Sequence, residues 1–280
     1  MNKIIINSNE LLNILTNKSI FYKVKNKHQM FYNYSNCVSF KIIQSICIIS
    51  TTNNYSYSKN NLNVFNENNK DIEFNINYLD IKKLISFINE NKTREKKLLL
   101  ISFTLELDKV IFHYNNNNEI RLNNEPLIYP SFVNALKHYN NDKIQIKISN
   151  NDKILSILKD SLNKYKKDKK IKLTSKNIHK GLKHKIILKF ENNNLNLSIL
   201  ETIIKDNKFI IKINELCNIP IKLNKINEVA HFNFYLFYNI ILALDNNIDN
   251  ITLYRNNYKK PIPLIFSNDN NSFLIMSVAE

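Results

Sequence analysis

The sequence predicts an α+β protein built from two similar halves, and hydrophobic periodicity, composition and internal repetition support this prediction. Each half contains two amphipathic segments with helical spacing, and runs of strand-like hydrophobic residues follow each of them. The chain has 280 residues and is 44% hydrophobic, which suffices for two domains with buried cores. We therefore expect two domains, each made of a duplicated helix-plus-antiparallel-strands unit.

In the first half, segment 7–17 is predicted to be a helix, with Ser8 as its N-cap. Segment 77–89 is predicted to be a second helix, with Leu79, Leu84, Ile85 and Ile88 on its apolar face. Strands are expected at 37–44, 45–51, 54–58, 97–107, 109–115 and 119–128, with the asparagines of 115–118 as a turn.

In the second half, helices are predicted at 151–167 and 229–244. The second of these is the most apolar stretch of the chain, "VAHFNFYLFYNIILAL", and is shorter than the about 20 residues that a membrane span needs. Strands are expected at 184–191, 194–201, 208–216, 250–256, 259–268 and 272–278. The predicted boundary is Tyr129-Pro130, because proline disfavours helix in its predecessor; the expected domains are therefore 1–130 and 131–280.

Composition excludes several function classes. The chain contains a single glycine, Gly181, so glycine-rich phosphate loops and the GxSxG nucleophile elbow cannot occur. Cys37, Cys47 and Cys217 form no CxxC pair, which argues against a disulfide framework or a zinc site. The segment from His179 to His184 has the spacing HxxxxH, but no third metal ligand is evident, so we expect neither a metal nor another cofactor.

The net charge is +16, although the 52 asparagines indicate a coding bias that also enriches lysine. Ten lysines and one acidic residue, Asp168, occur between Lys164 and Lys185, and such clustering exceeds a uniform bias. The cluster is either a solvated loop or a polyanion contact. Lysines that fall off the apolar stripes of helices 77–89 and 151–167, or directly after the latter, either form an ordinary solvated face or attract the phosphates of a nucleic acid. These candidate binding residues are Lys82, Lys83, Lys153, Lys159, Lys164, Lys166, Lys167, Lys169 and Lys170. Asp80 and Asp160 are expected to cap helices or to be solvated.

Several segments resemble the bacterial DNA polymerase III β sliding clamp. "HKGLKHKIILKFENNNLNLSI" is similar to a glycine, strand, turn and strand of that family, and "HFNFYLFYNIILAL" is similar to its FNxxYLxxxLxxL helix. "YPSFVNAL" resembles its FPDYxxVxP connector, and "KKPIPLIFSNDNNSFLIMSVAE" resembles its closing hairpin, although only Met276 remains of the usual MPMRL ending. The family has three clamp domains per chain, whereas two are found here.

This resemblance implies the DNA clamp fold and a non-catalytic processivity factor, which encircles duplex DNA and tethers the replicative polymerase. Its partners would be double-stranded DNA, the polymerase catalytic subunit and the clamp loader, in the cytoplasm. The resemblance also transfers a partner-peptide pocket that consists of Thr52, Tyr57, Pro130, Ala135, Leu274, Met276 and Val278; interdomain core packing is the other interpretation of these residues.

The resemblance, together with the domain count, implies the oligomer. Sliding clamps are rings of six domains, and a two-domain chain needs three copies to supply them, so a homotrimer is the expected assembly. The alternative is a monomeric, non-encircling clamp-fold protein that binds nucleic acid as a scaffold or regulator.

Overall fold

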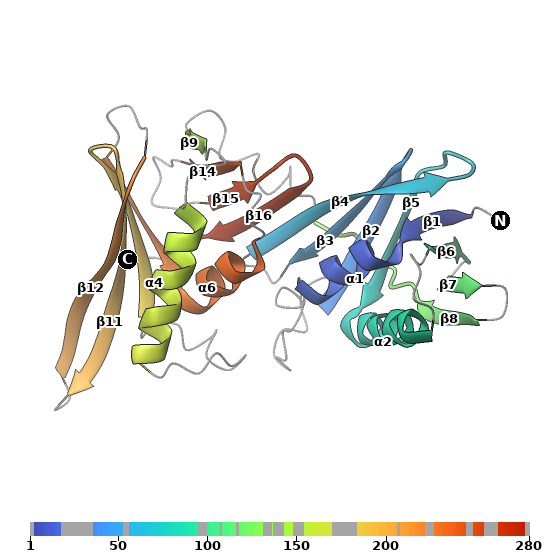
Figure 1. Cartoon of the computed structure of the whole chain (residues 1–280), viewed down its shortest axis with the longest axis horizontal. Coiled ribbons are helices and arrows are strands. Elements are labelled where there is room, and N and C mark those ends of the chain that lie inside the picture. The colour runs from blue at the N-terminus through green and yellow to red at the C-terminus, as the bar shows by residue number, and fades with distance from the viewer. Residues whose placement is uncertain are drawn as a thin grey trace. The chain divides into compact units, whose positions relative to one another are not determined.

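The computed structural model describes residues 3–17, 36–52, 56–94, 100–106, 108–115, 118–130, 136, 143–147, 154–169, 184–205, 208–221, 227–244, 249–254 and 263–277. These residues form four helices and sixteen strands (Figure 1). The chain divides into two compact units, Met1–Leu136 and Lys137–Glu280. The predicted α+β class is confirmed, because helices and antiparallel strands occur in both units.

Unit 1 repeats one order of elements twice: a leading strand, a helix and three further strands. The first repeat consists of β1 (Ile4–Asn7), α1 (Ser8–Asn17), β2 (Cys37–Ile43), β3 (Ile46–Thr52) and β4 (Ser56–Asn66). The second repeat consists of β5 (Ile72–Asn77), α2 (Tyr78–Arg94), β6 (Leu100–Leu105), β7 (Lys109–Asn115) and β8 (Asn118–Asn123). The predicted duplication is therefore present, with a leading strand added to each repeat.

The strands of unit 1 pair in the order β8-β7-β6-β1-β4-β3-β2-β5, and every pair is antiparallel. The leading strand of each repeat pairs with the strand that follows the helix of the other repeat, β1 with β6 and β5 with β2. The two ends of this series are linked at Asn75 of β5, whose carbonyl accepts the amide of Glu125 at 2.8 Å. The Asn75 side chain also donates to the carbonyl of Leu127 at 2.8 Å.

Unit 2 has the same order of elements. Its first repeat consists of β9 (Lys143–Lys147), α4 (Ile154–Asp168), β10 (His184–Glu191), β11 (Asn194–Lys205) and β12 (Lys208–Pro220). Its second repeat consists of β13 (Asn227–Asn233), α6 (Phe234–Ala243), β14 (Asn250–Tyr254), β15 (Pro263–Ser267) and β16 (Asn271–Met276). Leading strands are again exchanged, because β9 pairs with β14 and β13 pairs with β10. The strand orders within the unit are β16-β15-β14-β9 and β12-β11-β10-β13.

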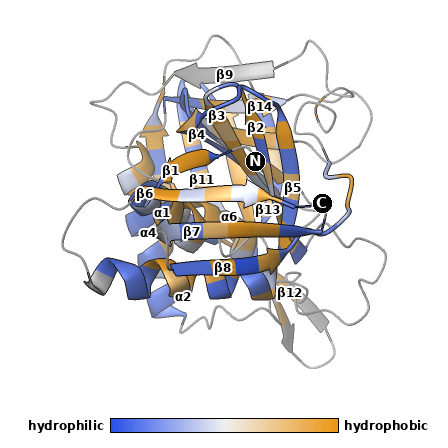
Figure 2. Ribbon diagram, turned by 90° about the vertical axis from the view of Figure 1, so that its right-hand side faces the viewer, coloured by the Kyte–Doolittle hydropathy of each residue, from blue (hydrophilic) through white to orange (hydrophobic). Residues whose placement is uncertain are grey.

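The helices pack in pairs within their units, α1 with α2 and α4 with α6. The core of unit 1 contains the stacked rings of Phe40 and Phe74, whose centroids are 4.9 Å apart. Figure 2 shows β1 and β6 mainly in the colour of hydrophobic residues, and most of α2 in the colour of hydrophilic ones. In the described part of the chain, no helix is long and apolar enough to cross a membrane.

The predicted helix 229–244 is wrong in its first part. Asn227–Asn233 is strand β13, in which Ala230 and Phe232 are buried while Val229 is 39% exposed. This alternation is the two-residue period of a strand on a sheet. The helix begins only after Asn233, whose side chain accepts the amides of Tyr235 and Leu236 at 2.9 and 3.2 Å.

Two further details of the predicted helices are corrected. The N-cap of α1 is Asn7 and not Ser8, because Asn7 Oδ1 accepts the amides of Asn9 and Glu10 at 2.9 and 3.3 Å. Leu79 does not belong to the apolar stripe of α2; it is 67% exposed. The buried stripe consists of Ile81, Leu84 and Ile88.

Strand β4 is longer than the predicted 54–58 and includes asparagine-rich residues 60–66. Leu62 and Val64 alternate there with the exposed Asn63 and Phe65. The strand period therefore continues through a segment whose composition is typical of a loop.

Candidate nucleic-acid interface

Helix α4 contains four of the nine predicted DNA-binding lysines, Lys159, Lys164, Lys166 and Lys167, and Lys169 directly follows the helix. Its apolar stripe consists of Ile154, Leu155, Leu158, Leu162 and Tyr165, all of which are buried. Lys164, Lys167 and Lys169 are exposed, whereas Lys159 and Lys166 are half-buried. The prediction that these lysines lie off the stripe is confirmed for the described residues; Lys153 and Lys170 lie outside them.

Three of these lysines make contacts inside unit 2. Lys159 donates to the carbonyl of Leu244 at 2.7 Å, and Leu244 is the C-cap of α6. A cation at a helix C-terminus stabilises the orphan carbonyls and the helix dipole. Lys166 lies 5.1 Å from the ring centroid of Tyr238, and Lys169 forms an ion pair with Glu201 at 2.9 Å. Lys159 therefore has a structural role, because it stabilises the C-terminal end of α6.

Lys164 and Lys167 differ from those three. They are three residues apart on the exposed face of α4, and three-residue spacing places side chains side by side on a helix. Among the described residues, no ion pair involves either of them. Their ammonium groups are therefore the cations of α4 that are available to an external anion.

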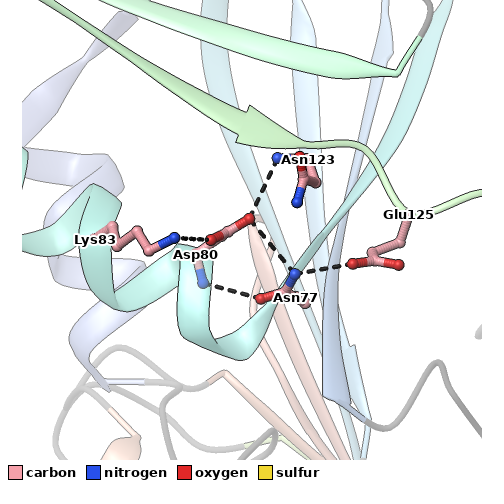
Figure 3. A network of polar contacts seen from close by, with 5 residues as sticks. All are labelled: Asn77, Asp80, Lys83, Asn123 and Glu125. Atoms are coloured by element: carbon pink, nitrogen blue, oxygen red, sulfur yellow. Dashed lines mark hydrogen bonds and ion pairs between the residues drawn. The ribbon is translucent and has the colours of Figure 1, made fainter.

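Lys83 of α2 belongs to a network of polar side chains (Figure 3). Asp80 is 4% exposed, and its Oδ1 accepts Lys83 Nζ at 2.7 Å. Asp80 Oδ2 accepts the amide of Asn123 at 3.2 Å, which joins the first turn of α2 to β8. Asn77 is the N-cap of α2, since its Oδ1 accepts the amide of Asp80 at 2.9 Å.

This network reduces the charge that α2 offers to a ligand. The ion pair with Asp80 compensates Lys83, although the Lys83 side chain is 66% exposed. Lys82 is exposed and lies 4.6 Å from the ring centroid of Tyr78. Asp80 neither caps α2 nor is solvated, so that expectation is wrong: Asn77 is the N-cap, and the buried Asp80 carboxylate accepts Lys83 and the amide of Asn123. The burial of this carboxylate could not be predicted from its position in the sequence.

The other two helices contribute almost no positive charge. Helix α1 has one charged residue, Glu10, and α6 has none. On α6, Tyr235 is only 7% exposed, whereas Leu242 is 46% exposed. Burial also raises the pKa of the Tyr235 hydroxyl above its ordinary value of 10.0. The positive charge of the described helices is therefore concentrated on α2 and α4.

The candidate metal ligand His184 lies in an aromatic cluster. Its Nδ1 is 3.3 Å from the Tyr165 hydroxyl, and its ring lies 6.1 Å from that of Phe234. Burial, followed by the charge of Glu201, raises the pKa of Tyr165 to about 12. His179 lies outside the described residues, and among those described no group of three His, Cys, Asp or Glu side chains forms a metal site.

The residues of the predicted peptide pocket fall in both units. Thr52 and Tyr57 are buried cross-strand partners in β3 and β4, and Thr52 Oγ1 donates to the carbonyl of Ser56 at 2.8 Å. Pro130 is half-buried in the segment after β8. Leu274 and Met276 belong to β16 in unit 2; Leu274 is 3% exposed and Met276 is half-buried. Ala135 and Val278 lie outside the described residues, and a pocket shared by these residues stays a prediction.

Solved structures of bacterial DNA polymerase III beta subunits resemble this chain. The beta subunit of DNA polymerase III from Thermotoga maritima matches all of the chain, with a TM-score of 0.70 and 11% identity, over 66% of its own length. The corresponding subunit of Pseudomonas aeruginosa matches 99% of the chain, with a TM-score of 0.70 and 10% identity, over 66% of its length. The Helicobacter pylori beta clamp, bound to a DNA ligase peptide, matches with a TM-score of 0.64 and 12% identity, over 66% of its length.

The chain thus has the DNA clamp fold, and the predicted resemblance to the bacterial β sliding clamp is confirmed at the level of structure. The chain spans about two thirds of the length of these clamps. No protein-family model matches the sequence, and no curated protein matches it significantly.

Proposed function

We propose that this chain is a DNA polymerase processivity factor, a sliding clamp that encircles duplex DNA and tethers the replicative polymerase. The observation that carries the proposal is the clamp fold itself, which matches 99–100% of the chain at TM-scores near 0.70. Exposed lysines on α2 and α4 support it, because charge without base-reading groups suits a protein that slides. The proposed role is non-catalytic, in the cytoplasm.

A ring requires copies of the chain to associate, and β12 supports such association. This strand is the terminal strand of the order β12-β11-β10-β13, and its residues Ile211 and Ile213 are each 63% exposed. Among the described strands, the outer edge of β12 has no partner, and an edge with exposed isoleucines is a template for pairing with another strand. Two clamp units per chain favour a closed ring of three copies joined head to tail.

The tethering part of the proposal needs a site for partner peptides. The H. pylori clamp was solved with a DNA ligase peptide, and a corresponding interaction here would bring the polymerase and the clamp loader to the predicted pocket. Its predicted residues are Thr52, Tyr57, Pro130, Ala135, Leu274, Met276 and Val278. The replacement Met276→Asp should then abolish stimulation of the cognate polymerase while the mass of the assembly stays unchanged.

The decisive experiment combines mass and binding. Light scattering of the purified chain should give three times the 33.1 kDa of one copy, and duplex DNA should bind without sequence preference and more weakly at higher salt. A monomer at micromolar concentration would contradict the ring.

A monomer that still binds duplex DNA would support the second candidate, a non-encircling clamp-fold scaffold or regulator. One observation favours this alternative: α1 and α6 contribute no basic residue. A monomer without affinity for DNA would contradict both candidates.

A further inference from the structure

Unit 1 has an apolar patch on the face of its sheet that points away from α1 and α2. Cross-strand pairing joins Phe65 to Ile5 and Ile43 to Ile46, whereas the residues next to these four in their strands belong to the buried core. Leu100 is two residues before the partner of Ile5, and Ile46 is the partner of the residue two before Phe65. Phe65 is 63% and Leu100 is 55% exposed. A contiguous exposed apolar surface of this kind marks an interaction site.

Hydrogen bonds hold the backbone around this patch in place. Gln44, in the turn between β2 and β3, has a φ of 53°, whereas the other described residues with positive φ are asparagines. Such a conformation is uncommon for glutamine, and it persists only where the surroundings fix it. Here the Gln44 carbonyl accepts Asn66 Nδ2 at 3.1 Å, and the Ser45 carbonyl accepts the amide of Val64 at 2.8 Å. The turn that carries Ile43 and Ile46 is therefore fixed against β4 before any partner binds, which lowers the entropy cost of binding.

The charges around the patch indicate which class of partner fits it. The exposed Lys3 and Glu67 lie side by side, because the Glu67 amide donates to the Lys3 carbonyl at 3.3 Å. Lys41 forms an ion pair with Glu73 at 3.2 Å. Opposite charges thus balance at the rim, although the whole chain has a net charge of +16. Nucleic acid and anionic lipid need clustered cations, and a second copy would be repelled by its equal net charge. An apolar centre with a balanced polar rim is the composition of a contact with a different protein.

The strand arrangement determines the shape of that contact. Strand β1 lies between β4 and β6, and β4 also pairs with β3, so the patch has no free edge to which a strand could be added. From β3 to β6 the patch crosses three strand spacings, roughly 14 Å in all. A helix of about ten residues has the same length and carries apolar side chains at i, i+3, i+4 and i+7 on one side. We propose that this patch, centred on Phe65, docks an amphipathic helix of a partner protein.

The test uses the full chain and a labelled helical peptide of about 14 residues, with leucine at i, i+3, i+4 and i+7 and equal numbers of Glu and Lys elsewhere. Fluorescence anisotropy should show saturable binding that does not weaken between about 0.1 and about 1 M salt, because apolar contacts are not screened. Phe65→Ser should weaken binding at least about tenfold, as expected for a central aromatic anchor. Leu100→Ser should weaken it in the same direction, and it keeps the proposal testable if Phe65→Ser is unstable.

Two controls separate this patch from general stickiness. Leu79→Ser removes a side chain of similar exposure, 67%, from α2 and should leave the affinity for the peptide unchanged. A peptide of the same composition, with its leucines spread around the helix, should not bind.

Four results would overturn the proposal. They are no binding at about 1 mM peptide, equal binding by Phe65→Ser and the unmodified chain, binding that disappears at about 1 M salt, and a lower mass of Phe65→Ser than of the unmodified chain in light scattering. The last result would identify a second copy as the occupant. The assay requires neither DNA nor a ring, so a chain that binds duplex DNA but not the peptide contradicts this proposal alone. A chain that binds only the peptide contradicts only the proposed function.

Discussion

At the residue scale, Asn192 and Asn193 form the two-residue turn between β10 and β11 with positive φ angles of 47° and 62°. Asn69 has a φ of 50° in the turn after β4. Glycine usually occupies such positions, and asparagine is the next most tolerant residue. A chain with one glycine therefore uses asparagine both for turns and, at Asn7, Asn77 and Asn233, for helix N-caps.

Asn60 is an asparagine without such a role. It lies in β4, is 1% exposed, and neither Oδ1 nor Nδ2 has a hydrogen-bond partner among the described residues. A buried unpaired amide is unfavourable, so Asn60→Val should raise the free energy of unfolding by about 1–2 kcal/mol in denaturant titrations.

Asn66 is the matched control for this prediction. It is also buried in β4, but its Nδ2 donates to the carbonyls of Gln44 and Lys70 at 3.1 and 3.0 Å. Asn66→Val should therefore destabilise the protein. A destabilisation of similar size at both positions would show that Asn60 has a partner in solution.

Cys47 makes the stability depend on pH. It is fully buried, and burial raises the pKa of its thiol from 9.0 to about 12. The unfolded chain loses this proton above pH 9, whereas the folded chain retains it until about pH 12. The thiol therefore contributes stability below pH 9 that is lost as the pH rises, at about 1.4 kcal/mol per pH unit.

The pH dependence of Cys47→Ala provides the measurement. Between about pH 9 and 11 the free energy of unfolding of this variant should fall less steeply than that of the unmodified chain, by the contribution of one thiol. Parallel curves would indicate that the Cys47 thiol ionises equally in the folded and unfolded chains.

At the element scale, the recurring junction is a strand, an asparagine and a helix. The asparagine ends β1, β5 and β13 and caps the helix that follows. At α2 the junction has further contacts, because Asn77 Nδ2 donates to Glu125 Oε1 at 2.8 Å (Figure 3). This contact connects the cap to the segment after β8.

Asn77→Ala should consequently cost more stability than a helix cap alone. A cap is worth about 1 kcal/mol, and Asn7→Ala at α1, where the Asn7 side chain accepts two amides of the first turn, gives that reference value. We expect a larger effect for Asn77→Ala, and a coupling of about 0.5–3 kcal/mol with Asp80→Ala in a double-mutant cycle. If Asn7→Ala and Asn77→Ala lower the free energy of unfolding equally, and Asn77 shows no coupling with Asp80, the Asp80 network adds no stability beyond that of an ordinary helix cap.

At the scale of the whole molecule, we predict that the exposed edge of β12 joins the copies of the chain to one another. Replacing Ile211 and Ile213 by lysine should abolish self-association, because charged side chains block edge pairing. The variant should keep the circular dichroism of the original, since both side chains are 63% exposed. Ile128→Lys, at a position 97% exposed in unit 1, is the control and should leave the mass unchanged. An unchanged mass in the β12 variant would place the joint elsewhere.

The sequence by itself determined the α+β fold class and the repeated order of helices and strands. Helical spacing at 7–17, 77–89 and 151–167 agrees with α1, α2 and α4, and His184–Glu191 and Lys109–Asn115 are strands as predicted. These signals are local, since one buried face repeats every 3.6 or every two residues. The clamp resemblance could also be found from motifs in the sequence, because its helix and closing hairpin keep their order and spacing.

Only the tertiary structure decided which polar side chains are held by contacts within the protein and which are available to a ligand. Lys159 and Lys164 are indistinguishable as letters on one helix, yet Lys159 contacts a carbonyl 85 residues away and Lys164 is exposed. Val229–Asn233 is a strand because β10 pairs with it, although its apolar composition also suits a helix. Both outcomes depend on partners that are distant in sequence, and the energy of a hydrogen bond or a strand pair depends on where its partner lies.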